Sequence, residues 1–271
     1  MDQTERPSFV MPIEEPAAPA IPRDSATVLV TREAAQGFEV FMLERHMASD
    51  VLGGAYVFPG GTVDAADRDP ALADVVDGMP EDLVRALGDD ALALVVCAIR
   101  ETFEEAGFLL ARGDDGEPSR LDAQRWVEWR RALNARELTA LEFARAARIR
   151  FAADLIRFWG RLITPIQAPK RYDARFFVAL APEGQAPLHD DVETTASVWV
   201  RPADAIARGR AGTLTIIYPT RKTLESLAPH GTAAALFEAA RGRSADPITP
   251  RVVVRDGEAR VELPDGTSES P

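Results

Sequence analysis

Residues 100–107, Arg-Glu-Thr-Phe-Glu-Glu-Ala-Gly, are the stretch of this chain best suited to chemistry. Residues three and four positions apart share one face of an α-helix, so this spacing brings the carboxylates of Glu101, Glu104 and Glu105 together. Like charges in one patch repel one another unless a cation neutralises them, and hard divalent cations prefer oxygen ligands. If such a cation binds here, Mg²⁺ or Mn²⁺ is the implied metal. The alternative is a solvated acidic face with Arg100 as a local counter-charge.

A tight turn at residues 58–61, Phe-Pro-Gly-Gly, lies upstream of these acids. Paired glycines let backbone carbonyls or amides approach a metal ion or a phosphate closely. The turn therefore favours the metal site over the solvated acidic face.

Residues 100–108 resemble the second half of the Nudix hydrolase signature, R-E-U-x-E-E-x-G-U, in which U is a bulky apolar residue. Thr102 replaces the first U. Upstream, Gly61 fits the opening glycine of the signature, and Asp67 stands where the family has a glutamate. Residues 68–92 then interrupt the two halves as an insertion. The split signature resembles the Nudix branch of the mammalian peroxisomal coenzyme A diphosphatase and its bacterial relatives.

This resemblance implies the fold and the metal chemistry. The expected fold class is α/β, a Nudix-type α/β/α sandwich with a mixed sheet and a helical insertion. Glu101, Glu104 and Glu105 would ligate one or more Mg²⁺ or Mn²⁺ ions with the backbone carbonyl of Gly61, and Arg100 would orient the carboxylates. The bound metal would neutralise charge on a diphosphate and acidify the water that attacks phosphorus.

The substrate side of the site is expected to use cations and glycine. Guanidinium groups bind phosphate bidentately, so Arg45, Arg171 and Arg175 are candidate substrate residues, together with Gly60. A surface charge cluster is the alternative for the arginines. Glu193, in an expected loop, is the candidate general base, and the alternative is that the acids of this loop only solvate it.

The coenzyme A motif of other Nudix enzymes is half present. Arg45 and Gly54 are in register with it, whereas His46 and Asp50 replace its serine and its second arginine. The predicted function is metal-dependent hydrolysis of the diphosphate linkage in a nucleoside diphosphate derivative, with coenzyme A or acyl-CoA as the first substrate to test. The alternatives are hydrolysis of ADP-ribose, NADH or nucleotide sugars, or a Nudix-fold ligand-binding or regulatory module without catalysis. Because all three glutamates are retained, an enzyme is favoured.

Apolar periodicity and turn residues predict the elements that position this site. Strands are expected at 26–31, 38–43, 155–163, 174–180 and 196–200, a helix at 91–110, one or two amphipathic helices within 121–150, further helices from Pro202 and at 218–240, and a hairpin at 251–263. Trp126 and Trp129 are expected in the core rather than stacked on an adenine. The predicted organisation is a flexible segment 1–22, a Nudix domain 23–230 with a helical insertion at about 115–150, and a C-terminal helix, hairpin and tail at 231–271.

Composition bounds the partners. A net charge of −12 repels polyphosphate backbones, so nucleic-acid binding is not expected. No apolar run reaches the length of a membrane span, and the start of the chain lacks the pattern of a secretory signal, so a cytoplasmic protein is expected. The single cysteine, Cys97, excludes an intrachain disulfide and is expected to be a buried helix residue. A homodimer is left open.

Overall fold

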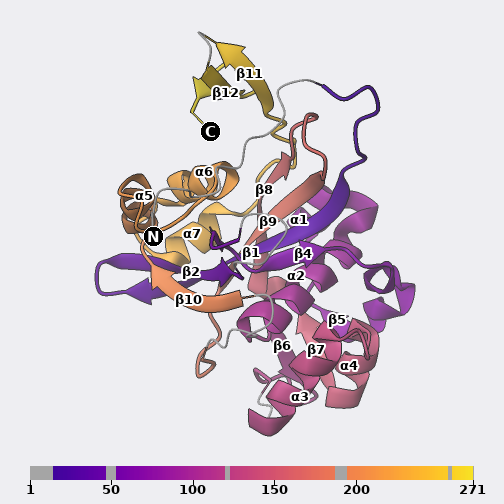
Figure 1. Ribbon diagram of the computed structural model, residues 1–271. Coiled ribbons are helices and arrows are strands. Elements are labelled where there is room, and N and C mark those ends of the chain that lie inside the picture. The colour runs from indigo at the N-terminus through magenta and orange to yellow at the C-terminus, as the bar shows by residue number, and fades with distance from the viewer. Residues whose placement is uncertain (1–14, 47–52, 120–122, 187–193, 256–257, 271) are drawn as a thin grey trace, which may run out of the picture.

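A mixed seven-stranded sheet forms the centre of the protein in the computed structural model, which describes residues 15–46, 53–119, 123–186, 194–255 and 258–270 (Figure 1). Its strands are β1 (Arg23–Ala34), β2 (Gly37–Arg45), β3 (Tyr56–Val57), β4 (Gly60–Thr62), β8 (Ile156–Ile163), β9 (Tyr172–Leu180) and β10 (Thr194–Val200). The order is β10-β2-β1-β9-β8, with β3 beside β2 and β4 beside β1. Strand β1 pairs in parallel with β9 and antiparallel with β2 and β4, so the sheet is mixed.

Apolar residues alternate between the two faces of this sheet, as the period of a strand requires. In β1, Val28 and Val30 face one core cluster and Leu29 faces the other. In β2, Phe41 faces the same cluster as Val28 and Val30, and Met42 faces the same cluster as Leu29. Both faces of the sheet must therefore be covered by helices.

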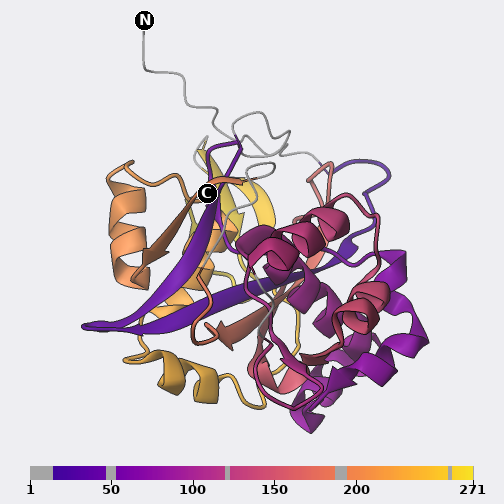
Figure 2. The same ribbon diagram turned by 90° about the horizontal axis from the view of Figure 1, so that it is seen from below.

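Two helical layers provide that cover (Figure 2). The helices on the first face are α1 (Glu81–Leu87), α2 (Ala91–Ala106), α3 (Ala123–Asn134) and α4 (Ala140–Ala147), and those on the second are α5 (Pro202–Arg210), α6 (Tyr218–Leu227) and α7 (Ala233–Ala239). The fold is the expected α/β/α sandwich, and that prediction is confirmed. Within the described ranges, none of the helices combines the length and hydropathy that crossing a bilayer requires.

The two insertions pack against each other through a small second sheet. Strand β7 (Ile149–Ala152) pairs in parallel with β5 (Val76–Asp77) and antiparallel with β6 (Ala111–Gly113). Strand β5 lies inside the signature insertion and β7 ends the helical insertion. Four 3₁₀ helices complete this side of the molecule: η1 (Ala65–Arg68), η2 (Pro70–Val75), η3 (Gly88–Asp90) and η4 (Ala153–Leu155).

The C-terminal segment forms a separate three-stranded sheet in the order β11-β12-β13. Its strands are β11 (Arg251–Arg255), β12 (Glu258–Glu262) and β13 (Ser268–Glu269). The pairing of β11 with β12 is the expected hairpin, and its turn at residues 256–257 lies outside the described residues.

Two expected helices have different bounds in the structure. The helix expected at 91–110 ends at Ala106, because Gly107 adopts a left-handed φ of 75° and terminates it. Residues 108–110 are apolar and fully buried, so the apolar sequence pattern extends past the end of the helix. The helix expected at 218–240 is divided into α6 and α7, and Thr232 starts α7 by accepting from the amide of Ala235.

Candidate active site

Helix α2 carries the candidate site on its last two turns. Residues 94–99 are buried all around the helix, because α2 lies between the sheet and the insertions. The polar residues begin at Arg100, where one face of the helix approaches β4 and η1. A buried, well-packed helix therefore presents its acids at its C-terminal end.

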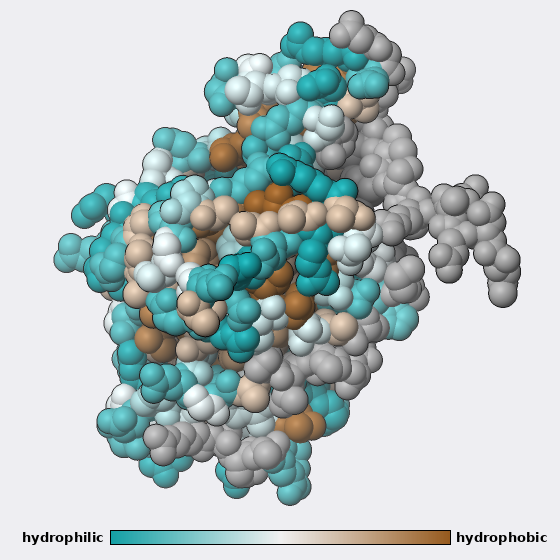
Figure 3. All heavy atoms as spheres, turned by 90° about the vertical axis from the view of Figure 1, so that its left-hand side faces the viewer, coloured by the Kyte–Doolittle hydropathy of each residue, from teal (hydrophilic) through white to brown (hydrophobic). Residues whose placement is uncertain are grey.

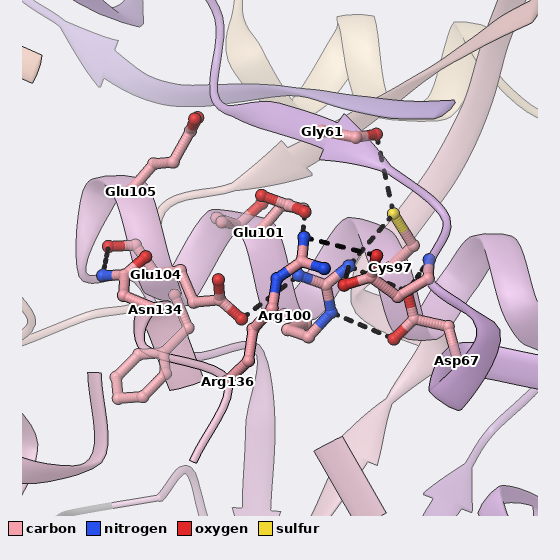
Figure 4. Close-up of polar contacts among 12 residues, drawn as sticks. Gly61, Asp67, Cys97, Arg100, Glu101, Glu104, Glu105, Asn134 and Arg136 are labelled. Carbon is pink, nitrogen blue, oxygen red and sulfur yellow. Dashed lines mark hydrogen bonds and ion pairs between the residues drawn. The ribbon is translucent and has the colours of Figure 1, made fainter. Parts of the chain in front are cut away.

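Arg100 is the centre of the polar network (Figure 4). Its Nε and Nη2 donate to the two carboxylate oxygens of Asp67 at 3.0 and 2.8 Å. Its Nη1 donates to Oε1 of Glu101 at 2.8 Å and to Oε1 of Glu104 at 3.2 Å. Because Asp67 precedes the insertion and Arg100 follows it, this bidentate pair joins the two halves of the interrupted signature in space.

The two glycines of β4 permit close packing, Gly61 against α2 and Gly60 against β1. A Cβ atom at Gly61 would lie 2.5 Å from the Glu101 carboxyl carbon, and one at Gly60 would lie 2.3 Å from the Ala26 carbonyl oxygen. Gly60 also has a φ of 153°, which L residues rarely adopt. Its amide donates to Oε2 of Glu105 at 2.8 Å, whereas the Gly61 carbonyl accepts a weak bond from Cys97 Sγ at 3.7 Å.

The candidate site holds more carboxylates than the buried guanidinium of Arg100 can neutralise. Burial raises the pKa of Glu101 and raises that of Glu104 to about 7, although Arg100 opposes both shifts. Burial, the largest single effect, lowers the pKa of Arg100, but the hydrogen bond to Asp67 and the negative charges of Glu101 and Asp67 together outweigh it, so the pKa of Arg100 is raised. One guanidinium does not offset this many carboxylates, so the cluster holds excess negative charge in a partly desolvated place.

The chemistry of these donors fits a hard divalent cation, because they supply several carboxylate oxygens. A bound cation would also offset the free-energy cost of burying those carboxylates. Among the described residues, however, no group of three acidic, histidine or cysteine side chains stands ready to hold a metal ion. The reason is visible in the hydrogen bonds: Glu101 and Glu104 turn toward Arg100, and Glu105 turns toward the amide of Gly60. Metal binding would require the carboxylates to reorient.

The arginines expected to bind substrate are engaged with the protein itself. Arg171 donates to the carbonyls of Thr164 and Ala20. Arg175 is buried and donates to Oδ1 of Asp24 at 2.8 Å, so neither arginine gains support as a phosphate ligand. Arg45 ends β2, where its amide donates to the carbonyl of Ala55.

Two further expectations concern residues away from this cluster. Glu193, the candidate base, lies outside the described residues. The tryptophans of α3 pack as expected: Trp126 is buried, with its indole N–H donating to the Gly107 carbonyl, and Trp129 is partly buried against the same core.

Arg130 is an important residue of the site that the sequence did not indicate. Its Nε donates to the Phe103 carbonyl at 2.8 Å, and its Nη2 donates to the carbonyls of Glu104 at 2.8 Å and Glu105 at 3.2 Å. A buried arginine from α3 thus caps the end of α2, where helix carbonyls lack partners. No local pattern announces such a contact, because the residues are far apart in the chain.

Two hollows of the described surface lie away from this cluster, which is identified by the chemistry of its side chains. One, of about 390 Å³, is lined by Trp199 and Asp204, and another, of about 480 Å³, by Asp114 and Arg148. Figure 3 shows the face that carries α5, where hydrophilic residues are interleaved with smaller hydrophobic areas.

Comparison with known proteins agrees with this geometry. A family model described as the NUDT19 Nudix domain matches residues 79–225. The crystal structure of a Nudix hydrolase from Alicyclobacillus acidocaldarius is 30% identical, with a TM-score of 0.71, and the match covers 84% of this chain and 99% of that one. The chain belongs to the Nudix hydrolase family. Within that family, its match is to the NUDT19 Nudix domain.

Curated relatives point to the same branch. The chain is 28% identical to acyl-coenzyme A diphosphatase NUDT19 of Gallus gallus, over 63% of this chain and 56% of that protein. For the protein of the same name from Homo sapiens the identity is 26%, over 63% of this chain and 55% of the relative. The chain thus spans about half the length of the curated relatives it matches.

Proposed function

We propose that this protein hydrolyses the diphosphate linkage of coenzyme A or an acyl-CoA, using Mg²⁺ or Mn²⁺. The observation that carries the proposal is the network in which Arg100 holds Asp67 of η1 together with Glu101 and Glu104 of α2, the helix that also bears Glu105. The names of the curated relatives support the substrate class, as does the partial coenzyme A motif that includes Arg45.

In the proposed reaction, the oxygen of a water molecule bonds to one phosphorus, the bridging P–O bond breaks, and the leaving phosphate departs with the bridging oxygen. Glu101, Glu104 and Glu105 would hold the metal ions with the Gly61 carbonyl. The bound metal would neutralise the diphosphate and acidify the attacking water.

The other residues act by position. Arg100 would orient the carboxylates as they turn to the metal, and Glu193 is the proposed base that takes the proton from water. Arg45, Gly60, Arg171 and Arg175 remain proposed as substrate residues, although the contacts of Arg171 and Arg175 give them no direct support. The cytoplasmic location and the homodimer stay predictions.

A second function of the same fold, ligand binding or regulation without catalysis, is opposed by the complete acid set. ADP-ribose, NADH and nucleotide sugars remain alternative substrates, because the reaction at phosphorus is the same.

The first experiment is hydrolysis of a panel of free coenzyme A, acyl-CoA thioesters, ADP-ribose, NADH and UDP-sugars with Mg²⁺ or Mn²⁺, with products identified by mass. Release of 3′,5′-ADP and a phosphopantetheine species is expected. The Glu104→Gln plus Glu105→Gln variant should lose turnover by at least about 100-fold while remaining folded. Glu258→Gln, at an exposed position of β12, is the matched control and should keep full turnover. Retained turnover in the double variant would exclude these glutamates as the metal ligands.

A further inference from the structure

Arg136 is a cation at the candidate site that comes from the helical insertion. Its Nη2 lies 3.4 Å from Oδ1 of Asp64, and the other oxygen of the same carboxylate lies 3.9 Å from Nη2 of Arg100. Asp64 therefore bridges the two guanidinium groups, and Figure 4 shows Arg136 beside Arg100 and Glu104. The side chain of Arg100 is 8% exposed and that of Arg136 is 76% exposed, so Arg136 is the one that a ligand can reach.

The backbone at Arg136 is a second, independent observation. Its φ is 56°, a left-handed conformation that is uncommon for residues other than glycine. Helix α3 ends here in a Schellman turn, since the amide of Arg136 donates to the Leu133 carbonyl and that of Glu137 donates to the Ala132 carbonyl. Glycine is the usual residue at this position because it pays no Cβ penalty. An arginine kept in a strained position beside an active site suggests a role for its side chain.

The turn that carries Arg136 is held firmly against the end of α2. Arg130 donates to the carbonyls of Phe103, Glu104 and Glu105, and Nδ2 of Asn134 contacts the Glu104 carbonyl at 3.4 Å. The end of α3 is therefore fixed relative to the carboxylates, and Arg136 is presented to the same solvent-facing side.

We propose that Arg136 binds the diphosphate of the substrate, as a substrate-binding residue supplied by the insertion. For the identity of its ligand, this proposal rests on the proposed function. A diphosphate carries negative charge to a site rich in carboxylates on a protein of net charge −12, so a reachable guanidinium lowers the cost of its approach. The planar fork of arginine suits two phosphate oxygens, and the weak exposed pair with Asp64 can be exchanged for them.

The test uses Arg136→Gly, which removes the side chain and places the preferred residue in the left-handed turn. Thermal stability should be unchanged or slightly higher. Affinity for ADP in the presence of Mg²⁺, measured by calorimetry, should fall about tenfold or more, as loss of a charge-assisted hydrogen bond predicts. KM for the substrate found in the panel should rise with it, and Arg136→Lys should restore part of the loss.

Arg148→Gly is the matched control. Arg148 is also an arginine with a left-handed φ, 54°, at a helix end of the same insertion, and its partner is Asp114 rather than Asp64, the carboxylate beside Arg100. This variant should bind ADP and turn over substrate as the wild type does. Equal ADP affinity in Arg136→Gly and wild type, an equal loss in Arg148→Gly, or no ADP binding by the wild type would each overturn the proposal. If the wild type hydrolyses no compound but binds ADP through Arg136, the proposed function fails and this inference stands.

Discussion

At the scale of the residue, Asp67 matters more than its place outside the acidic cluster suggests. Its side chain is 1% exposed, and its two oxygens accept from Arg100 while one of them also accepts from the amide of Asp64. The Nudix signature has a glutamate here. The shorter aspartate suffices because η1 brings the backbone close to Arg100.

Replacing Asp67 with asparagine should lower the free energy of unfolding by roughly 2–3 kcal/mol, because an amide cannot accept both charge-assisted hydrogen bonds of a buried guanidinium. Turnover should fall as well, since Arg100 would no longer be held between Asp67 and the glutamates. Urea unfolding and steady-state kinetics measure the two effects. Asp89→Asn, at an exposed position, is the control and should change neither. An unaltered stability for Asp67→Asn would contradict the bidentate pair.

At the scale of the element, the end of α2 depends on α3. Arg130 is 6% exposed and donates to the carbonyls of Phe103, Glu104 and Glu105 in the last turn of the helix. The helical insertion is in this respect part of the scaffold of the candidate site, because the capped turn carries Glu104 and Glu105.

Arg130→Met keeps much of the volume and removes the donors, so the free energy of unfolding should fall by roughly 2–3 kcal/mol. Arg145→Met on α4 is a suitable comparison, because that side chain is 57% exposed and its ion pair with Asp74 spans 4.0 Å. It should cost at most about 1 kcal/mol in the same urea titration. If the two variants are equally stable, the cap contributes nothing.

The sequence predicted the elements better than their junctions. Alternating and helical patterns located the central strands and α2, because each of those elements buries a repeating set of side chains. The end of α2 was misplaced, since residues 108–110 are as apolar as the helix before them. The small sheet was missed because strands as short as β5 carry no periodic signal and their partners lie far along the chain.

For the candidate site, too, the sequence predicted the residues that share one element but not the contacts between elements. Helical spacing was enough to group Glu101, Glu104 and Glu105 on one helix, and the position of Asp67 followed from the signature. The spacing did not reveal which arginines are reachable: Arg175 is buried in ion pairs, whereas Arg136 is exposed at the cluster. Such contacts depend on tertiary packing, which a local pattern does not contain.

At the scale of the whole molecule, the proposed metal binding at the acid cluster would raise the stability of the folded state. A ligand that binds only the folded state stabilises it by about 2.7 kcal/mol at 100 times its Kd. For a chain of 271 residues this corresponds to a rise in Tm of roughly 5–10 °C. Differential scanning calorimetry with Mg²⁺ or Mn²⁺, compared with chelator, should show the rise. The Glu104→Gln plus Glu105→Gln variant should lose most of it, and an equal rise in that variant would place the metal elsewhere.

The small sheet of β5, β7 and β6 makes the two insertions structurally dependent on each other. Strand β7 of the helical insertion is paired on one edge by β5, and Leu72, Val75 and Leu83 of the signature insertion complete the core beside it. Removing residues 68–92 to restore a continuous signature would leave β7 with an open edge and the core with a void. A shorter descendant of this chain would therefore have to lose both insertions together. It would also lose Arg136, which the helical insertion places beside the signature residues.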